Sequence, residues 1–202
     1  MKIVAIDQSL AKCAMVFMDT EDKDQVVDFT LSKTGNASVK TKRKDVNYYN
    51  TLEEQIHQIC NDVVTFVKTY SPEYIVFEAL SFGSVGNATR SLASLYGAIR
   101  ETLIREGLTK GTVILDYAPT SLKTFARELL KPLDRVERDE KGNIVLLKSK
   151  KEKKIKMDKK LMVKAVREVY GGDYLSEYNY STGLDDLADA TLLALKVSKE
   201  YA

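Results

Sequence analysis

Four carboxylates stand where this 202-residue sequence is otherwise apolar. Asp7 ends the run KIVAI and Glu78 ends the run YIVF, and both runs have the composition of buried strands. Asp186 and Asp189 fall in GLDDLADATLLAL, where a helical pattern begins. Asp186 shares its helical stripe with the apolar positions Ala190, Leu193 and Val197. A carboxylate on such a stripe needs a compensating cation.

Oxygen ligands of this kind suit Mg²⁺, and Mn²⁺ as a substitute. The sequence has one histidine and two cysteines, so a nitrogen or sulfur ligand set is not expected. Two such ions, about 3.5–4 Å apart, can activate a water and stabilise the leaving oxygen of a phosphodiester. The four acids therefore predict metal-dependent phosphoryl chemistry.

Each acid also has a simpler explanation. A single acid after a strand commonly marks where the strand reaches solvent. Acids in a first helical turn interact favourably with the helix dipole, by about 0.3–1 kcal/mol each. Asp185 points about 100° away from Asp186 on the helix, and we assign it to capping or solvent. Neither explanation accounts for Asp186 on the apolar stripe.

The formal net charge of +2 conceals a strong asymmetry. Residues 123–160 contain 14 basic and 7 acidic side chains, and residues 148–160 alone contain eight lysines and two acids. Residues 173–189 contain five acids and no lysine or arginine. A basic segment beside an acidic cluster suits a protein that binds phosphates and cations together, although a solvated lysine-rich loop is the simpler interpretation.

The elements that must position these residues follow from periodicity. Strands are predicted at 2–6, 13–18, 25–31, 73–80 and 112–118. Helices are predicted at about 52–70, 89–106, 158–170 and 185–199, and a further helix is predicted to begin at Pro119. The polar, basic stretch 32–46 is predicted to be a loop. The order β-β-β-α-β-α-β-α indicates an α/β fold with a ribonuclease H-like mixed five-stranded sheet and helices on both faces.

We expect residues 1–202 to form a single nuclease domain with a basic insertion at about 133–155, turning at residues 141–143. Cys13 and Cys60 lie far apart in apolar segments and are expected to be buried thiols. The sequence has no pattern of a signal peptide or membrane span, so a cytoplasmic protein is expected.

Four motifs, in order, resemble those of RuvC-like Holliday junction resolvases, particularly the variants of bacteriophages. They are VAIDQSLAKCA at the first strand, VFEALSF at the fourth, YAPTSLK, and DDLADATLLAL in the last helix. They span the chain from about residue 3 to residue 197. The resemblance implies a homodimeric endodeoxyribonuclease that resolves four-way DNA junctions by Mg²⁺-dependent hydrolysis through paired nicks.

The resemblance also implies roles for individual residues. Asp7, Glu78, Asp186 and Asp189 correspond to the catalytic, metal-binding acids. The residues that correspond to DNA-binding positions are Lys123, Lys159 or Lys156, and Phe82, the last being one position later than the family's base-stacking aromatic. The helix at 89–106, with Leu95, Tyr96 and Ile99, corresponds to the element that pairs two subunits. In this context the basic insertion is expected to bind DNA.

Two other functions remain open at this point. An enzyme of the same fold could act on flaps, forks or RNA–DNA hybrids. A non-catalytic junction-binding protein is the alternative from a different class, and concentrated negative charge against DNA argues against it.

Overall fold

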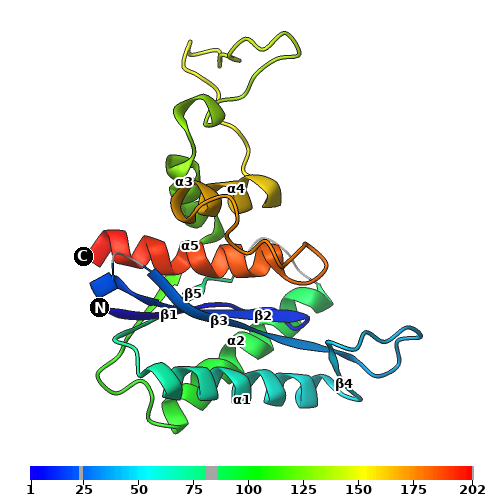
Figure 1. Cartoon of the computed structure of the whole chain (residues 1–202). Coiled ribbons are helices and arrows are strands. Elements are labelled where there is room, and N and C mark those ends of the chain that lie inside the picture. Colours follow the sequence, from blue (N-terminus) through cyan, green and yellow to red (C-terminus); the bar gives the residue numbers. More distant parts are fainter. Residues whose placement is uncertain (23–24, 81–85, 202) are drawn as a thin grey trace.

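The computed structural model describes residues 1–22, 25–80 and 86–201. A mixed six-stranded sheet lies at its centre, in the order β4-β3-β2-β1-β5-β6 (Figure 1). The strands are β1 (Lys2–Asp7), β2 (Lys12–Asp19), β3 (Gln25–Asn36), β4 (Asn47–Tyr49), β5 (Tyr74–Glu78) and β6 (Val113–Tyr117). The helices are α1 (Leu52–Tyr70), α2 (Asn87–Arg105), α3 (Pro119–Leu129), α4 (Lys159–Tyr170) and α5 (Leu184–Tyr201), with short 3₁₀ turns at Thr20–Asp22 and Pro132–Asp134.

The strand pairing confirms the predicted fold class. Strands β1, β2 and β3 form an antiparallel meander, while β5 pairs parallel with β1 and β6 pairs parallel with β5. Because β1, β5 and β6 run in the same direction, their carboxyl ends meet at one edge of the sheet.

The prediction of five strands and of a loop at 32–46 was wrong in part. Strand β3 continues to Asn36, and β4 pairs parallel with its last residues. The buried positions in this extension are polar: the Ser32 hydroxyl donates to Asp62 Oδ2 (2.5 Å), and the Thr34 hydroxyl donates to the Leu10 carbonyl oxygen. In this part of β3 the inward positions are occupied by hydrogen-bonded polar residues. The alternation of apolar and polar residues that predicts a strand is therefore missing from its sequence.

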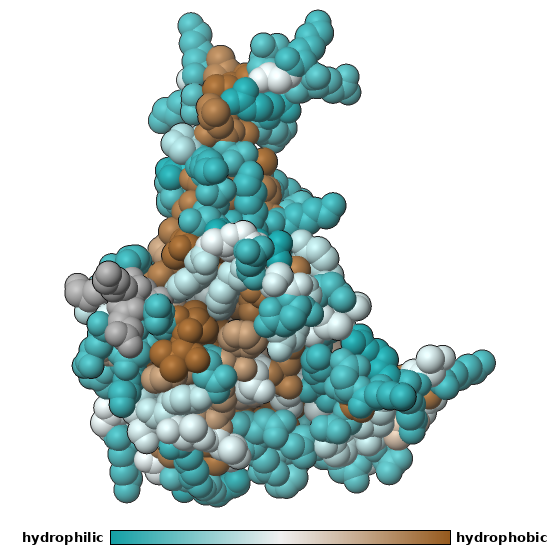
Figure 2. All heavy atoms as spheres, in the orientation of Figure 1, coloured by the Kyte–Doolittle hydropathy of each residue, from teal (hydrophilic) through white to brown (hydrophobic). Residues whose placement is uncertain are grey.

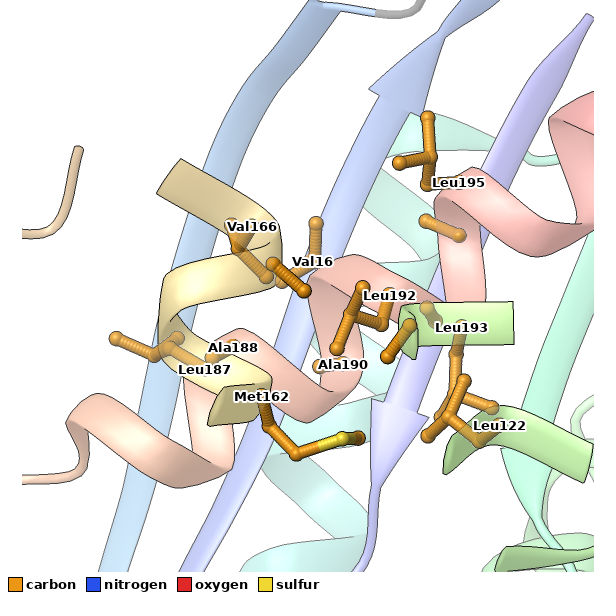
Figure 3. Packing of buried hydrophobic residues seen from close by; sticks show 14 of the residues in the cluster. Val16, Leu122, Met162, Val166, Leu187, Ala188, Ala190, Leu192, Leu193 and Leu195 are labelled. Atoms are coloured by element: carbon orange, nitrogen blue, oxygen red, sulfur yellow. The ribbon is translucent and has the colours of Figure 1, made fainter. Parts of the chain in front are cut away.

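Helices cover both faces of the sheet, as predicted. Helices α1 and α2 pack on one face, and α5 packs on the other, mainly against β1 and β2. Helices α3 and α4 lie outside α5, so α5 is enclosed between them and the sheet (Figure 1). Figure 3 shows Leu187, Leu192 and Leu193 of α5 among Val16 of the sheet and Met162 of α4. Helix α5 is therefore buried around most of its circumference.

The segment before α5 approaches the sheet closely. Gly183 has φ +112°, and a Cβ at this position would lie 2.6 Å from Leu31 Cδ1. Only glycine fits both the conformation and the space. This contact fixes the start of α5 against β3, near the carboxyl end of β1.

The insertion, which we name the basic arm (residues 133–155), projects from the ends of α3 and α4 (Figure 1). Three of its segments pair with one another through the bridges Val136–Lys154, Arg138–Ile144 and Leu146–Glu152. The expected turn at 141–143 is present, and a second turn follows at 148–151. The assignment of the whole chain to one domain remains a prediction.

Two other expectations concern composition. Cys13 and Cys60 are free thiols and both are buried, as predicted. Burial raises the pKa of each thiol, so neither is a reactive thiolate at neutral pH. In the described ranges, the helices are all too short or too polar to cross a membrane.

Candidate active site

Asp7 and Glu78 lie side by side at the ends of two neighbouring parallel strands. The last paired residues are Ile6 of β1 and Phe77 of β5, and each carboxylate follows directly. Ile3, Ala5 and Val76 belong to the core beneath α5. Because strand side chains alternate between faces, Asp7 and Glu78 point to this same face.

The second pair of acids comes from the first two turns of α5. Asp186 and Asp189 are three residues apart, on one side of the helix. Asp186 Oδ2 lies 3.5 Å from Lys12 Nζ, and the same ammonium donates to the Tyr180 carbonyl oxygen (2.8 Å). Lys12 thus holds the start of α5 against the start of β2.

The four carboxylates lie close enough together for their charges to affect one another. Burial raises the pKa of Asp7 well above its usual range, and the charges of Asp189, Glu78 and Asp186 raise it further. Burial and the charge of Glu78 raise the pKa of Asp189 to about 7. Burial also raises the pKa values of Glu78 and Asp186. The negative charges of Glu78 and Asp186 thus act on both Asp7 and Asp189, and such a cluster of acids attracts cations.

The assignment of Asp185 to capping or solvent was wrong. Asp185 is 4% exposed and forms an ion pair with Lys159, the first residue of α4. The side of α5 that carries Asp185 faces α3 and α4, which pack over it. Lys196, on the same side, is also buried, with its ammonium over the rings of Tyr117 and Phe125.

Buried oxygen atoms without partners test whether a cation fits here. Within the part of the chain that the structure describes, Asp185 Oδ1, Asp189 Oδ1 and Gln8 Oε1 are buried and accept no hydrogen bond, and the buried Asp186 Oδ2 has the 3.5 Å ion pair with Lys12 in place of a hydrogen bond. Such atoms are costly unless something compensates them. The donor set is entirely oxygen, which suits Mg²⁺ or Mn²⁺.

The acidic side chains of the site do not form a ready-made set of metal ligands. Within residues 1–22, 25–80 and 86–201, no three acidic, histidine or cysteine side chains form a group that could hold an ion as they stand. Lys12 and Lys159 provide the positive charge instead, at Asp186 and Asp185. The site therefore has the ligand chemistry for a cation, while two lysines neutralise part of it.

The predicted DNA-binding residues fall at different places. A cavity of about 380 Å³ opens beside the acids and is lined by Glu78, Asp189, Lys123 and Lys159, among others. Lys123 also lowers the pKa of Glu78, against the effect of burial. Lys156 is exposed and does not line this cavity. Phe82 lies outside the described residues.

Two of the three expected pairing residues of α2 face inward. Leu95 and Ile99 are fully buried against the sheet, so they cannot contact a second subunit. The Tyr96 hydroxyl donates to Asp116 Oδ1 (2.5 Å), and Arg100 pairs with Asp116 (2.7 Å). The solvent side of α2 instead carries Ala93, Gly97 and the 63% exposed Ile104.

Sequence reasoning missed Lys12 and Gln8 as residues of the site. Gln8 Nε2 donates to the Glu78 carbonyl oxygen and joins the ends of β1 and β5. Both residues lie in the first motif, and the short link between β1 and β2 returns Lys12 to the edge that carries Asp7. An antiparallel hairpin drawn from the predicted strands would have indicated this.

Comparison with known proteins gives structural matches alone. No protein-family model matches the chain, and no curated protein matches its sequence. A Thermus thermophilus RuvC structure in complex with a Holliday junction substrate is similar, with a TM-score of 0.59, 14% identity, and coverage of 100% of this chain and 97% of that one. The yeast mitochondrial Holliday junction resolvase Ydc2 has a TM-score of 0.58 and 14% identity, over 95% of this chain and 75% of that one. The chain therefore has the ribonuclease H-like fold of the RuvC-type resolvases, as the order of its strands and helices predicted.

Proposed function

We propose that this chain is a structure-selective endodeoxyribonuclease that resolves four-way DNA junctions by Mg²⁺-dependent hydrolysis. The observation that carries the proposal is the convergence of Asp7, Glu78, Asp186 and Asp189 at one sheet edge, where the buried Asp189 Oδ1 accepts no hydrogen bond from any described residue. The fold agrees with it, because solved Holliday junction resolvases have the same architecture.

In this proposal the four acids hold Mg²⁺, or Mn²⁺ in its place, as a pair of ions. When bound, the metal would supply an activated water and charge stabilisation of the leaving oxygen, leaving 5′-phosphate ends. Lys12 and Lys159 neutralise Asp186 and Asp185 in the metal-free protein, and they become available to phosphates when a cation takes over that charge. Lys123, beside Glu78, binds the phosphate that enters the cavity.

A homodimer is part of the same proposal. Paired cuts on opposed strands of a four-way junction require two active sites related by a two-fold axis. The solvent side of α2, with Gly97 and Ile104, is the surface we assign to the pairing, in place of Leu95 and Ile99. The proposed setting is a bacterial or phage-infected cell, and the motif resemblance to bacteriophage variants supports it.

The test is cleavage of a synthetic four-way junction with Mg²⁺, Mn²⁺ or Ca²⁺, mapping the cuts on all four strands. We expect paired, symmetric cuts with Mg²⁺ and Mn²⁺. Asp7→Asn should lower the rate by more than about 100-fold, since changes at residues that merely support metal ligands already cost 10–100-fold. Asp19→Asn, at the opposite edge of the sheet, is the matched control and should cut normally.

Other outcomes separate the alternatives. Faster cleavage of flaps, forks or RNA–DNA hybrids than of junctions would mean that the enzyme has the same fold but a different substrate. Tight junction binding without metal-dependent cleavage would identify a binding protein. An Asp7→Asn variant that folds and cuts like the wild type would refute the proposed metal site.

A further inference from the structure

A second basic projection lies beside the candidate active site, and the proposed function does not use it. We name it the basic loop (residues 37–46), which connects β3 to β4. It carries Lys40, Lys42, Arg43 and Lys44 against a single acid, Asp45. Figure 1 places it beyond the ends of β3 and β4, away from the basic arm, and Figure 2 shows a hydrophilic projection there.

Sheet register puts the basic loop at the same edge as the acids. Asp7 pairs with Ala14 of β2, and Ala14 pairs with Leu31 of β3. Strand β3 runs parallel to β1 and ends at Asn36, five residues beyond Leu31. At about 3.4 Å per residue, β3 extends about 17 Å past the level of Asp7. The same length spans about five nucleotides of a DNA strand.

Hydrogen bonds attach the loop to the segment that leads into α5. Arg43 Nη1 donates to the Ser181 carbonyl oxygen (2.7 Å), one residue after the carbonyl that Lys12 holds. The Arg43 backbone N–H donates to the Tyr48 hydroxyl (2.7 Å). The loop is therefore braced against the polypeptide that carries Asp186.

The one acid of the loop is neutralised within it. Asp45 accepts from Arg43 Nε and Nη2 (3.0 and 2.9 Å) and pairs with Lys33 (3.1 Å). Lys40, Lys42 and Lys44 are exposed, and within the described part of the chain none of the three lies within 4.0 Å of a carboxylate. The Lys42 ammonium lies 5.4 Å from the centre of the Tyr48 ring. Three cations consequently face solvent on a braced loop.

We infer that Lys40, Lys42 and Lys44 form a second DNA-backbone contact, on the side of the active site away from the basic arm, and that Arg43 positions it. The inference rests on the proposed function, since it assigns the loop to the same DNA substrate. Duplex DNA that passes the acids and continues in the direction of β3 would meet the acids at the scissile phosphate and the basic loop about five nucleotides away. Contacts to phosphate position the DNA without reading its sequence.

The first test compares two triple variants with equal loss of charge. Lys40→Gln/Lys42→Gln/Lys44→Gln changes the loop, and Lys2→Gln/Lys110→Gln/Lys199→Gln changes exposed lysines at the opposite edge. Binding of a four-way junction is measured between 50 and 200 mM salt. We expect the loop variant to lose about 10–100-fold in affinity and about 2–3 units of the salt slope. Equal affinity and slope for the two variants would overturn the inference.

The second test measures position. Lys42→Cys, Lys150→Cys and Lys110→Cys each add one exposed thiol for a photo-crosslinking reagent, because Cys13 and Cys60 are buried. Crosslinks from Lys42→Cys should lie about five nucleotides from the cut, on the other side of it from those of Lys150→Cys. Crosslinking from Lys42→Cys no stronger than from Lys110→Cys would contradict the inference.

Failure of the proposed function is distinguishable from failure of this inference. A wild-type protein that binds the junction without cutting it refutes the nuclease, and the two triple variants still decide the role of the loop. A wild-type protein that binds neither junction nor duplex DNA refutes both.

Discussion

Lys159, the first residue of α4, forms an ion pair with Asp185, whose carboxylate is buried beside the acids at the start of α5. This pair joins the start of α4, four residues after the basic arm, to the candidate metal site. The charge of Asp185 raises the pKa values of Asp186 and Asp189, and Lys159 lowers both. Lys159 thus compensates the acidic site before any cation or DNA binds.

Separating this pair should destabilise the protein. Lys159→Gln leaves Asp185 buried without its partner, which we expect to lower the free energy of unfolding by about 1–3 kcal/mol, because the exposed Lys159 side chain moderates the loss. Lys159→Gln/Asp185→Asn removes both charges and should recover most of it. Urea denaturation of Lys159→Gln, of Asp185→Asn and of the double variant gives the coupling energy between the two side chains. Additive effects in this cycle would mean that the pair is not coupled.

The acidic site should make the metal-free protein less stable as pH rises. The pKa of Asp189 is about 7 in the folded protein and about 3.9 when unfolded, so the folded state binds more protons between these values. The free energy of unfolding should therefore fall from pH 5 to pH 8 in EDTA. The pKa of Asp45 is lowered to about 2, so Asp45 stays ionised between pH 5 and pH 8 and does not contribute to this change in stability.

Thermal unfolding across this range measures the effect. Asp189→Asn should reduce the dependence of Tm on pH. At pH 8 it should raise Tm by a few degrees, which corresponds to a gain of about 1–2 kcal/mol in the free energy of unfolding. Mg²⁺ at pH 8 should also raise the Tm of the wild type. Asp19→Asn is the control. Stability that increases with pH in EDTA would be incompatible with the buried cluster.

Removal of the basic arm should weaken DNA binding and leave the fold intact. The Ile155 N–H donates to the Arg135 carbonyl oxygen (2.9 Å), so a two-residue Asn-Gly turn can replace residues 136–154. The deleted part holds seven basic and four acidic side chains. We expect the salt slope of junction binding to fall by about 2 units or more. At saturating junction, kcat should change by less than about threefold; an unchanged slope would exclude the arm from the interface.

The solvent side of α2 should control oligomeric state. Ile104→Glu places a charge on the proposed pairing surface, whereas Ile104 makes no contribution to the core. We expect a monomer by light scattering, with single nicks in place of paired cuts. Val113→Glu, at a similarly exposed apolar position on edge strand β6, is the comparison variant. A dimer that survives Ile104→Glu with paired cuts would place the interface elsewhere.

The sequence alone determined the fold class and the four central acids. Alternating and helical apolar patterns report burial directly, and they located β1, β5 and α5 to within a few residues. Asp7 and Glu78 were recognisable because each interrupts an apolar run, and Asp186 because it sits on an apolar stripe. Such local contrasts need no knowledge of which elements are neighbours.

Tertiary structure alone decided which charges meet. Lys12 and Asp186 are 174 positions apart in the chain, and the packing of α5 on the sheet brings them to 3.5 Å. Asp185 was misassigned because a helical wheel has one buried stripe, whereas α5 lies between the sheet and two further helices. Leu95 and Ile99 were misassigned for the converse reason, since a resemblance names an element without saying which of its sides the core takes. Burial depends on what covers a residue, and that is a property of the packed chain.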